Sequence, residues 1–138
     1  MIDLDFDNMA VIASNNHVFA VRDKFPASPG HTLVFPVREV ECWSGLYSAE
    51  VQSIMDMVDF IISNDTQGAD GWNVGWNDGE AAGKTVSRFH VHVIPRFFGD
   101  VVDPRGGIRG CIPEKRVYTT GPCTMLPDSE CEQCKKEV

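Results

Sequence analysis

The chain has 138 residues, 43% of them hydrophobic and 23% charged, and its formal net charge is −8. This length allows one domain, and the mixture of residues excludes a disordered chain, a coiled coil and collagen. An acidic chain repels the backbone of nucleic acids, so we expect no nucleic-acid partner.

The N-terminal part of the chain predicts three β-strands. Two of them, Met9–Ser14 and His17–Asp23, flank a pair of turn-forming asparagines. A loop follows at Pro26–Gly30, where two prolines and a glycine interrupt any hydrogen-bond ladder. The third strand, His31–Val37, comes directly after this loop.

One amphipathic helix is predicted over Ser48–Ser63. Ser48 is expected to cap the helix by accepting hydrogen bonds from its first free amides, and the charge of Glu50 suits the first turn. Apolar residues recur at the spacing of one buried helix face. They are Val51, Ile54, Met55, Val58, Ile61 and Ile62.

Two further strands are predicted in the second half of the chain, over Gly71–Asn77 and Arg88–Ile94. A loop of small residues, Gly79–Ser87, joins them, and Pro95 ends the second one. Five short strands and one long helix indicate an α+β fold. We expect an antiparallel five-stranded sheet with the helix packed on one face.

Beyond Gly99 the composition shifts to glycine, proline and cysteine. We therefore predict a domain over residues 1–110 and an irregular C-terminal extension over residues 111–138. An odd cysteine count argues against a disulfide framework. The extension is either a reduced tail or a structural zinc site with four thiolate ligands. These ligands would be Cys111, Cys123, Cys131 and Cys134.

The fifth predicted strand separates two kinds of side chain, because residues alternate between the faces of a strand. Its apolar face belongs in the core and is made of Phe89, Val91 and Val93. Its other face carries Arg88, His90 and His92. Two histidines and an arginine can bind an anion or exchange protons near neutral pH.

The charge is unevenly spread and agrees with an anion site. Residues 84–116 carry seven basic and three acidic side chains, although the whole chain is acidic. Such a window is either a solvated surface segment or the binding region for a small anion.

Metal binding is an alternative use of the same histidines. His31, His90 and His92 offer three imidazoles of the kind that bind zinc or iron. Arg88 argues against this interpretation, because it puts a cation on the same strand face. We predict no metal in the active site and keep a metal-dependent small-molecule enzyme as an alternative.

Several segments together resemble the histidine-triad (HIT) family. They are Asp23–Pro26, Pro29–Val34, Asn77–Gly83, Gly83–Val86 and Arg88–Arg96. The resemblance covers about residues 9 to 110. The family pattern has three alternating histidines, and Arg88 stands here at the position of the first.

The resemblance implies a nucleotide hydrolase or transferase that acts at the α-phosphate of a nucleoside ester, anhydride or phosphoramidate. His90 matches the histidine that attacks phosphorus, and His92 matches the one that contacts the phosphate. His31 is expected beside the phosphate or behind His90. Donors to the phosphate oxygens are expected from His92, Asn77, Thr85 and the amides around Gly83.

Residues of the second strand are candidates for holding the nucleoside. Phe19 and Val21 either flank the base or belong to the core. Asp23 either binds the ribose hydroxyls or is a turn residue before Pro26. The resemblance also implies a purine nucleotide substrate and a homodimer. The histidine chemistry itself requires no cofactor, although Mg²⁺ can accompany the substrate.

Arg88 and Lys84 add positive charge to the expected site. Arg88 binds a leaving polyphosphate, lowers the pKa of His90, or weakens the orientation of His90 so that turnover is poor. The leading prediction is therefore a hydrolase, for example of diadenosine polyphosphates. The alternatives are a nucleotide-binding or sensing module with little turnover and the metal-dependent enzyme.

The uncharged apolar runs are much shorter than the ~20 residues that cross a bilayer. Acidic residues also occupy the first positions, where an export signal carries basic ones. We therefore expect a cytoplasmic protein with no membrane partner.

Overall fold

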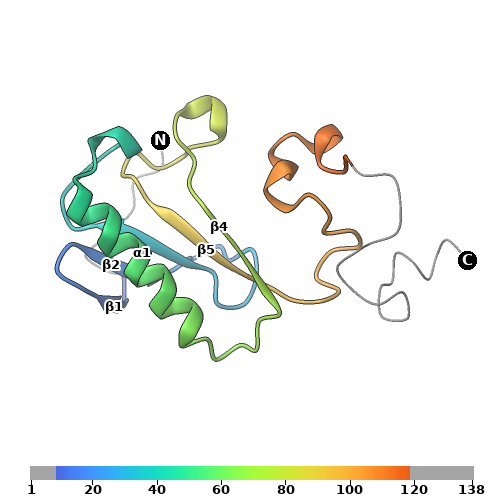
Figure 1. The fold of residues 1–138 in the computed structure, drawn as a ribbon, viewed down its shortest axis with the longest axis horizontal. Coiled ribbons are helices and arrows are strands. Elements are labelled where there is room, and N and C mark those ends of the chain that lie inside the picture. Colours follow the sequence, from blue (N-terminus) through green and yellow to red (C-terminus); the bar gives the residue numbers. More distant parts are fainter. Residues whose placement is uncertain (1–8, 119–138) are drawn as a thin grey trace, which may run out of the picture. The chain divides into compact units, whose positions relative to one another are not determined.

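The computed structural model describes residues 9–118. Residues 9–118 contain five strands and one long helix, and Figure 1 shows how they are arranged. In chain order they are β1 (Val11–Ser14), β2 (Val18–Arg22), β3 (Thr32–Pro36), α1 (Ser48–Ser63), β4 (Gly71–Gly75) and β5 (Val91–Arg96). The chain divides into two compact units, with one ending at Arg96 and the other beginning at Phe97. This division comes earlier than residue 110, and the predicted domain boundary stays a prediction.

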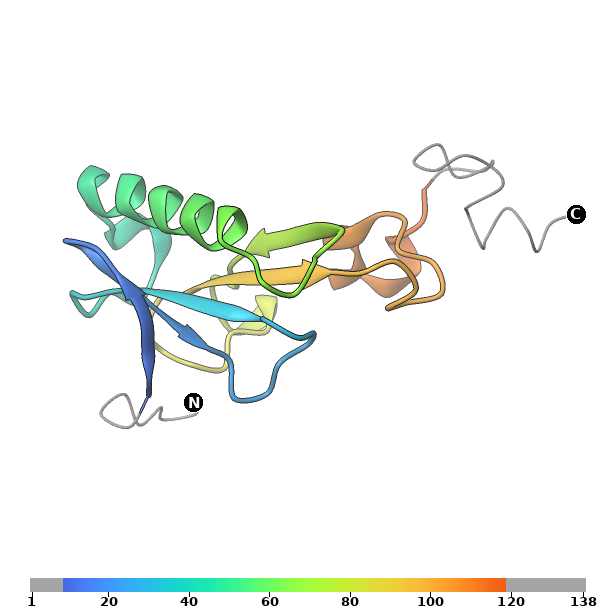
Figure 2. The same cartoon turned by 90° about the horizontal axis from the view of Figure 1, so that it is seen from below.

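The five strands form one antiparallel sheet in the order β1-β2-β3-β5-β4. The helix α1 runs along one face of this sheet, as Figure 2 shows. The predicted α+β fold is therefore confirmed. In the register of the central strands, Leu33 of β3 and Gly75 of β4 lie on either side of His92.

The last strand begins later and ends later than predicted. Phe89 leaves the β3 ladder and donates its N–H to the carbonyl of Val40 (2.6 Å), and β5 starts only at Val91. Pro95 lies inside β5 although it was expected to end the strand. Because β3 pairs no further than Val93, Pro95 has a partner strand on one side only, where a missing N–H is tolerated.

The core lies between α1 and the sheet. Its buried residues come from the helix and from the sheet face beneath it, and they include Ile54, Met57, Ile61, Val18, Ala20, Val34, Phe89, Val91 and Val93. Met55 was expected on the buried helix face but is 43% exposed, whereas Met57 is buried. The buried row runs through positions 54, 57, 58 and 61, one helical stripe that leaves Met55 on its flank.

The start of α1 differs from the prediction as well. Tyr47 is the N-cap and Ser48 is the first helical residue. The carboxylate of Glu50 accepts the N–H of Tyr47 (2.8 Å) and pairs with Arg38 (2.6 Å). Glu50 is only 4% exposed, so its charge is balanced by a guanidinium and a backbone donor.

The opposite face of the sheet has its own apolar cluster. Val21, Leu33 and Phe35 are buried there, with Met9 and Phe19 packed against them. No helix in the described ranges is long and apolar enough to cross a membrane.

The second unit contains two short 3-10 helices, η4 (Gly107–Cys111) and η5 (Pro113–Lys115). Arg116 donates to the carbonyls of Asp103 and Arg105 and so closes the loop before η4. Gly106 has a φ of 88°, and a Cβ there would lie 1.9 Å from the carbonyl oxygen of Arg116. Only glycine fits this approach.

Cys111, at the end of η4, is exposed and is a free thiol. Cys123, Cys131 and Cys134 lie outside the described residues. The zinc site of the extension therefore stays a prediction.

Candidate active site

Three histidines meet on the sheet face that α1 does not cover. His90 precedes β5, His92 lies within β5, and His31 directly precedes β3. The alternation predicted for this segment is confirmed, because Phe89, Val91 and Val93 are at most 1% exposed in the core. His90 and His92 point the other way and are half-buried.

The loop between β2 and β3 brings His31 into this group. Asp23 donates its N–H to the carbonyl of His31 (3.0 Å), and the Ser28 hydroxyl donates to the carbonyl of Pro95. Gly30 has a φ of 92°, and a Cβ there would lie 3.0 Å from Gln67. The loop is therefore closed between its own ends and attached to β5, and His31 is held at 5% exposure.

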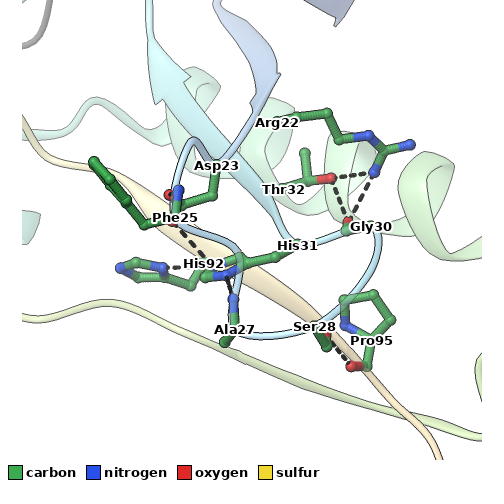
Figure 3. Close-up of polar contacts among 10 residues, drawn as sticks. All are labelled: Arg22, Asp23, Phe25, Ala27, Ser28, Gly30, His31, Thr32, His92 and Pro95. Atoms are coloured by element: carbon green, nitrogen blue, oxygen red, sulfur yellow. Dashed lines mark hydrogen bonds and ion pairs between the residues drawn. The ribbon is translucent and has the colours of Figure 1, made fainter.

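The hydrogen bonds of His31 fix the position of two protons (Figure 3). The N–H of Ala27 donates to His31 Nδ1 (3.0 Å), so the proton of the neutral ring sits on Nε2. His31 Nε2 lies 2.9 Å from His92 Nδ1. His31 therefore donates to His92, and the proton of neutral His92 is left on its Nε2.

His90 has the opposite arrangement. Its Nδ1 lies 2.9 Å from the backbone carbonyl of Arg88, which only accepts. The Nδ1 atom must then carry the proton, and Nε2 keeps a free lone pair. The ring of His90 also stacks on Phe35 with centroids 5.1 Å apart, which limits its rotation.

Burial lowers the pKa of all three rings. It is the largest cause for His31, for His90 and for His92, whose pKa falls to about 4. The positive charge of Lys84 lowers the pKa of His90 further. The site thus holds neutral imidazoles at pH 7, one offering a lone pair and another offering an N–H.

Asp23 lies at the edge of the histidine group. Its Oδ2 is 3.5 Å from His31 Nε2, and its Oδ1 accepts the N–H of Phe25 (2.8 Å). Asp23, His31 and His92 each offer a ligand atom, and these atoms lie within 4.8 Å of one another. This set differs from the three imidazoles considered from the sequence, because Asp23 stands in place of His90.

The Arg88 side chain reaches the end of β3. Its Nη2 donates to the carbonyls of Pro36 (2.6 Å) and Val37 (3.2 Å). Its guanidinium carbon lies 5.7 Å from the ring centroid of Phe19 and 5.9 Å from that of Phe35. The positive charge of Lys84 lowers the pKa of His90, whereas the hydrogen bond to the backbone carbonyl of Arg88 raises it. A contact between Arg88 and a leaving polyphosphate stays a prediction.

Phe19 and Val21, the two apolar candidates on β2, lie on the same face of the sheet as the histidines. Phe19 is half-buried and stacks on Phe35 at 5.5 Å between centroids. Val21 is buried in the cluster beside Leu33. Val21 thus has a core position, as its alternative interpretation held, and contact of either residue with a base stays a prediction.

The expected phosphate-binding residues lie in the connection between β4 and β5. Asn77 and Thr85 are exposed, and Gly83 has a φ of 90° with open space around it. The ammonium group of Lys84 donates to the carbonyl of Glu41. Within residues 9–118, no hydrogen bond joins Asn77 or Thr85 to a histidine.

Sequence reasoning missed the groups that orient the histidines. The N–H of Ala27 and the carbonyl of Arg88 are main-chain atoms, which no residue pattern reveals. The contact of Phe35 with His90 was predictable from the sequence. Residues alternate between the two faces of a strand, so His31, Leu33 and Phe35 share one face.

Comparisons with known proteins agree with this geometry. The model of the HIT domain matches residues 7–99. AP-4-A phosphorylase of Mycobacterium tuberculosis is 38% identical over 94 residues, which are 65% of this chain and 48% of that protein. The chain therefore spans about half the length of this relative.

The chain is also similar to a fungal enzyme and to a protein of known structure. The asymmetrical bis(5'-nucleosyl)-tetraphosphatase of Schizosaccharomyces pombe is 37% identical over 78 residues, which are 51% of this chain and 40% of that protein. A zinc-bound histidine triad family protein of Mycobacterium smegmatis superposes with a TM-score of 0.60 at 31% identity. That superposition covers 65% of this chain and 67% of the other.

Proposed function

Because the chain belongs to the HIT domain family, we propose that it is a nucleotide hydrolase that cleaves at the α-phosphate of a nucleoside ester, anhydride or phosphoramidate. The names of its relatives, a phosphorylase of AP-4-A and a bis(5'-nucleosyl)-tetraphosphatase, support a nucleotide-acting enzyme. A dinucleoside polyphosphate is the substrate that we put first. We also propose that the substrate is a purine nucleotide, that the protein forms a homodimer and that it is cytoplasmic.

The observation that carries the proposal is the orientation of His90. Its Nδ1–H is donated to the carbonyl of Arg88, so the lone pair of Nε2 is available for attack. Burial and Lys84 lower the pKa of the ring, which keeps it neutral and therefore nucleophilic at pH 7.

The proposed reaction has two displacement steps. In the first, His90 Nε2 forms a bond to the α-phosphorus, and the bond from phosphorus to the leaving group breaks. In the second, water attacks phosphorus and gives up a proton to the solvent, the P–N bond breaks, and the nucleoside monophosphate leaves while the ring regains its lone pair.

His92 is proposed to stabilise the charge that builds on the phosphate oxygens. His31 donates to His92 Nδ1 and so keeps the His92 proton on Nε2, from which it can be donated to an oxygen. We propose that Asn77, Thr85 and the amides around Gly83 supply further donors. Asp23 would accept from the ribose hydroxyls.

The test is a panel of adenylylated compounds assayed for AMP release. His90→Ala is expected to abolish release and to leave AMP binding measurable, whereas His17→Ala, in an exposed turn on another part of the sheet, should act as the wild type. A nucleotide linked to His90 should be trapped when the wild-type reaction is stopped. Unchanged AMP release by His90→Ala refutes the assignment, and AMP binding without release by the wild type favours the sensing module.

A second candidate is a metal site formed by Asp23, His31 and His92. The closeness of their ligand atoms supports it, as does the zinc-bound relative of Mycobacterium smegmatis. Tetrahedral zinc with Zn–N bonds of about 2.0–2.1 Å separates two nitrogens by about 3.3 Å. The 2.9 Å between His31 Nε2 and His92 Nδ1 suits a shared proton better. Stoichiometric zinc in the purified protein that is lost in His31→Ala would favour the metal.

A further inference from the structure

Two tryptophans far apart in the sequence form a stacked pair. Trp43 begins η2 (Trp43–Gly45), between β3 and α1, and Trp76 directly follows β4. Their ring centroids lie 4.4 Å apart and the rings are inclined by only 10°. Both also contact Phe89, at 6.1 and 5.8 Å between centroids. The indoles are 36% and 39% exposed, whereas Phe89 is buried.

The segment around Trp43 also contacts the first part of the connection between β4 and β5, residues 76–85, which we name loop 76–85. The backbone N–H of Trp43 donates to Asp78 Oδ2 (3.3 Å) near the start of this loop. The Lys84 ammonium donates to the carbonyl of Glu41 near its end. Residues 41–43 therefore form hydrogen bonds with loop 76–85 near both of its ends.

Loop 76–85 depends on such contacts for its position. Gly79 and Gly83 both have positive φ values, of 88° and 90°, and a Cβ on either would meet no atom within 4 Å. Glycines in open space leave a backbone with many accessible conformations. Within the loop, η3 (Glu80–Ala82) and the hydrogen bonds from Ala82 and Lys84 to the carbonyl of Gly79 give local order. The contacts of Asp78 and Lys84 attach the loop to the rest of the fold.

Phe89 connects this arrangement to the chemistry. It lies under both indoles and immediately precedes His90 in the chain. A shift of the indole pair would therefore move loop 76–85 relative to the proposed nucleophile. Displacement of catalytic groups by about 1 Å can cost about 100-fold in rate.

We propose that the Trp43–Trp76 pair is a clamp that positions loop 76–85 against His90. The inference rests on the proposed function, since the loop matters there as the source of phosphate donors. Trp43 and Trp76 are positioning residues in this role, and the expected consequence of loosening them is a lower kcat with little change in nucleotide affinity.

The experiment compares Trp43→Leu and Trp43→Phe with a matched control, Trp72→Phe. Trp72 lies within β4, packs against the core and takes no part in the stack. Two stacked indoles give an exciton couplet in far-ultraviolet circular dichroism, so both Trp43 variants should lose it while the control keeps it. Amide exchange of residues 77–85 should rise at least 10-fold in Trp43→Leu and much less in Trp43→Phe, which retains an aromatic ring.

The kinetic arm uses the substrate that the wild type cleaves fastest. Trp43→Leu should lower kcat 10- to 100-fold with KM and AMP affinity within about 3-fold, and Trp43→Phe should recover most of kcat. Unchanged exchange in residues 77–85 after loss of the couplet overturns the clamp. So does weakened AMP binding at unchanged kcat, because the indoles would then be a base platform.

The two proposals fail in different ways. If no adenylylated compound is cleaved by the wild type, the proposed function fails, and the clamp is still decided by amide exchange and the couplet. If Trp43→Leu does not fold, Trp76→Leu is used, since it removes the other ring of the stack. It should also lose the couplet and raise exchange in residues 77–85 at least 10-fold, and unchanged exchange overturns the clamp.

Discussion

Replacing His92 by asparagine should make the free energy of unfolding depend less on pH below about 6.5. In the unfolded chain the imidazole binds a proton with its ordinary pKa of 6.5, whereas the folded protein holds it neutral until about pH 4. The unfolded state then binds the additional proton between these two values, so the free energy of unfolding falls as pH falls from 6.5 to 4.

The magnitude follows from the size of the shift. A lowering from 6.5 to about 4 corresponds to about 3 kcal/mol of stability, fully present above pH 6.5 and lost by about pH 4. This is an upper value, because the ring keeps some contact with water. The introduced asparagine cannot titrate, and its side-chain oxygen can still accept the proton of His31 Nε2, so the substitution removes the titration and keeps the hydrogen bond.

The assay is urea unfolding of wild type and His92→Asn at several pH values between 7 and 4. The difference in unfolding free energy between the two proteins should change by about 3 kcal/mol over that range, with the wild type losing more. His17→Asn controls for loss of a histidine at an exposed position. A difference that stays constant within about 0.5 kcal/mol would refute the buried, neutral ring.

Three further substitutions test charged groups, two at the site and one at the start of α1. Lys84→Met should raise the pKa of His90, because Lys84 lowers it, and the acid limb of the kcat/KM profile should move to higher pH in a rate assay. Arg88→Met removes charged hydrogen bonds to the end of β3 and should cost about 1.5–3 kcal/mol of unfolding free energy in urea. Glu50→Gln should cost about 1–3 kcal/mol in the same assay, since the carboxylate is buried against Arg38 and the start of α1.

The fold was predictable because its elements have regular periods. The single amphipathic helix and the alternating strand around His90 and His92 follow directly from residue spacing. One error occurs where a tertiary contact replaces a strand contact, because the N–H of Phe89 bonds to the carbonyl of Val40 instead of joining the β3 ladder. The other is local: at the helix start the carboxylate of Glu50 accepts the N–H of Tyr47, and Ser48 is not the cap.

The sequence predicted that His31, His90 and His92 lie close together, but it did not predict their geometry. The spacing of His90 and His92 indicates that they share a face, but it cannot tell which ring nitrogen carries the proton. That depends on the N–H of Ala27 and the carbonyl of Arg88, two main-chain atoms brought in by the fold. The Trp43–Trp76 stack was not predictable for a similar reason. The two residues lie in separate connections between elements, and such a pair does not recur at a regular spacing in the sequence.

The predicted replacement of the leading histidine by Arg88 is compatible with the proposed nucleophile for a simple reason. What orients His90 is the backbone carbonyl of residue 88, and every amino acid supplies that atom. The arginine side chain is directed to the end of β3, where its bonds to the carbonyls of Pro36 and Val37 hold the same backbone segment in place. We infer that the substitution changes how residue 88 is anchored and leaves intact the hydrogen bond that directs the lone pair of His90 outward.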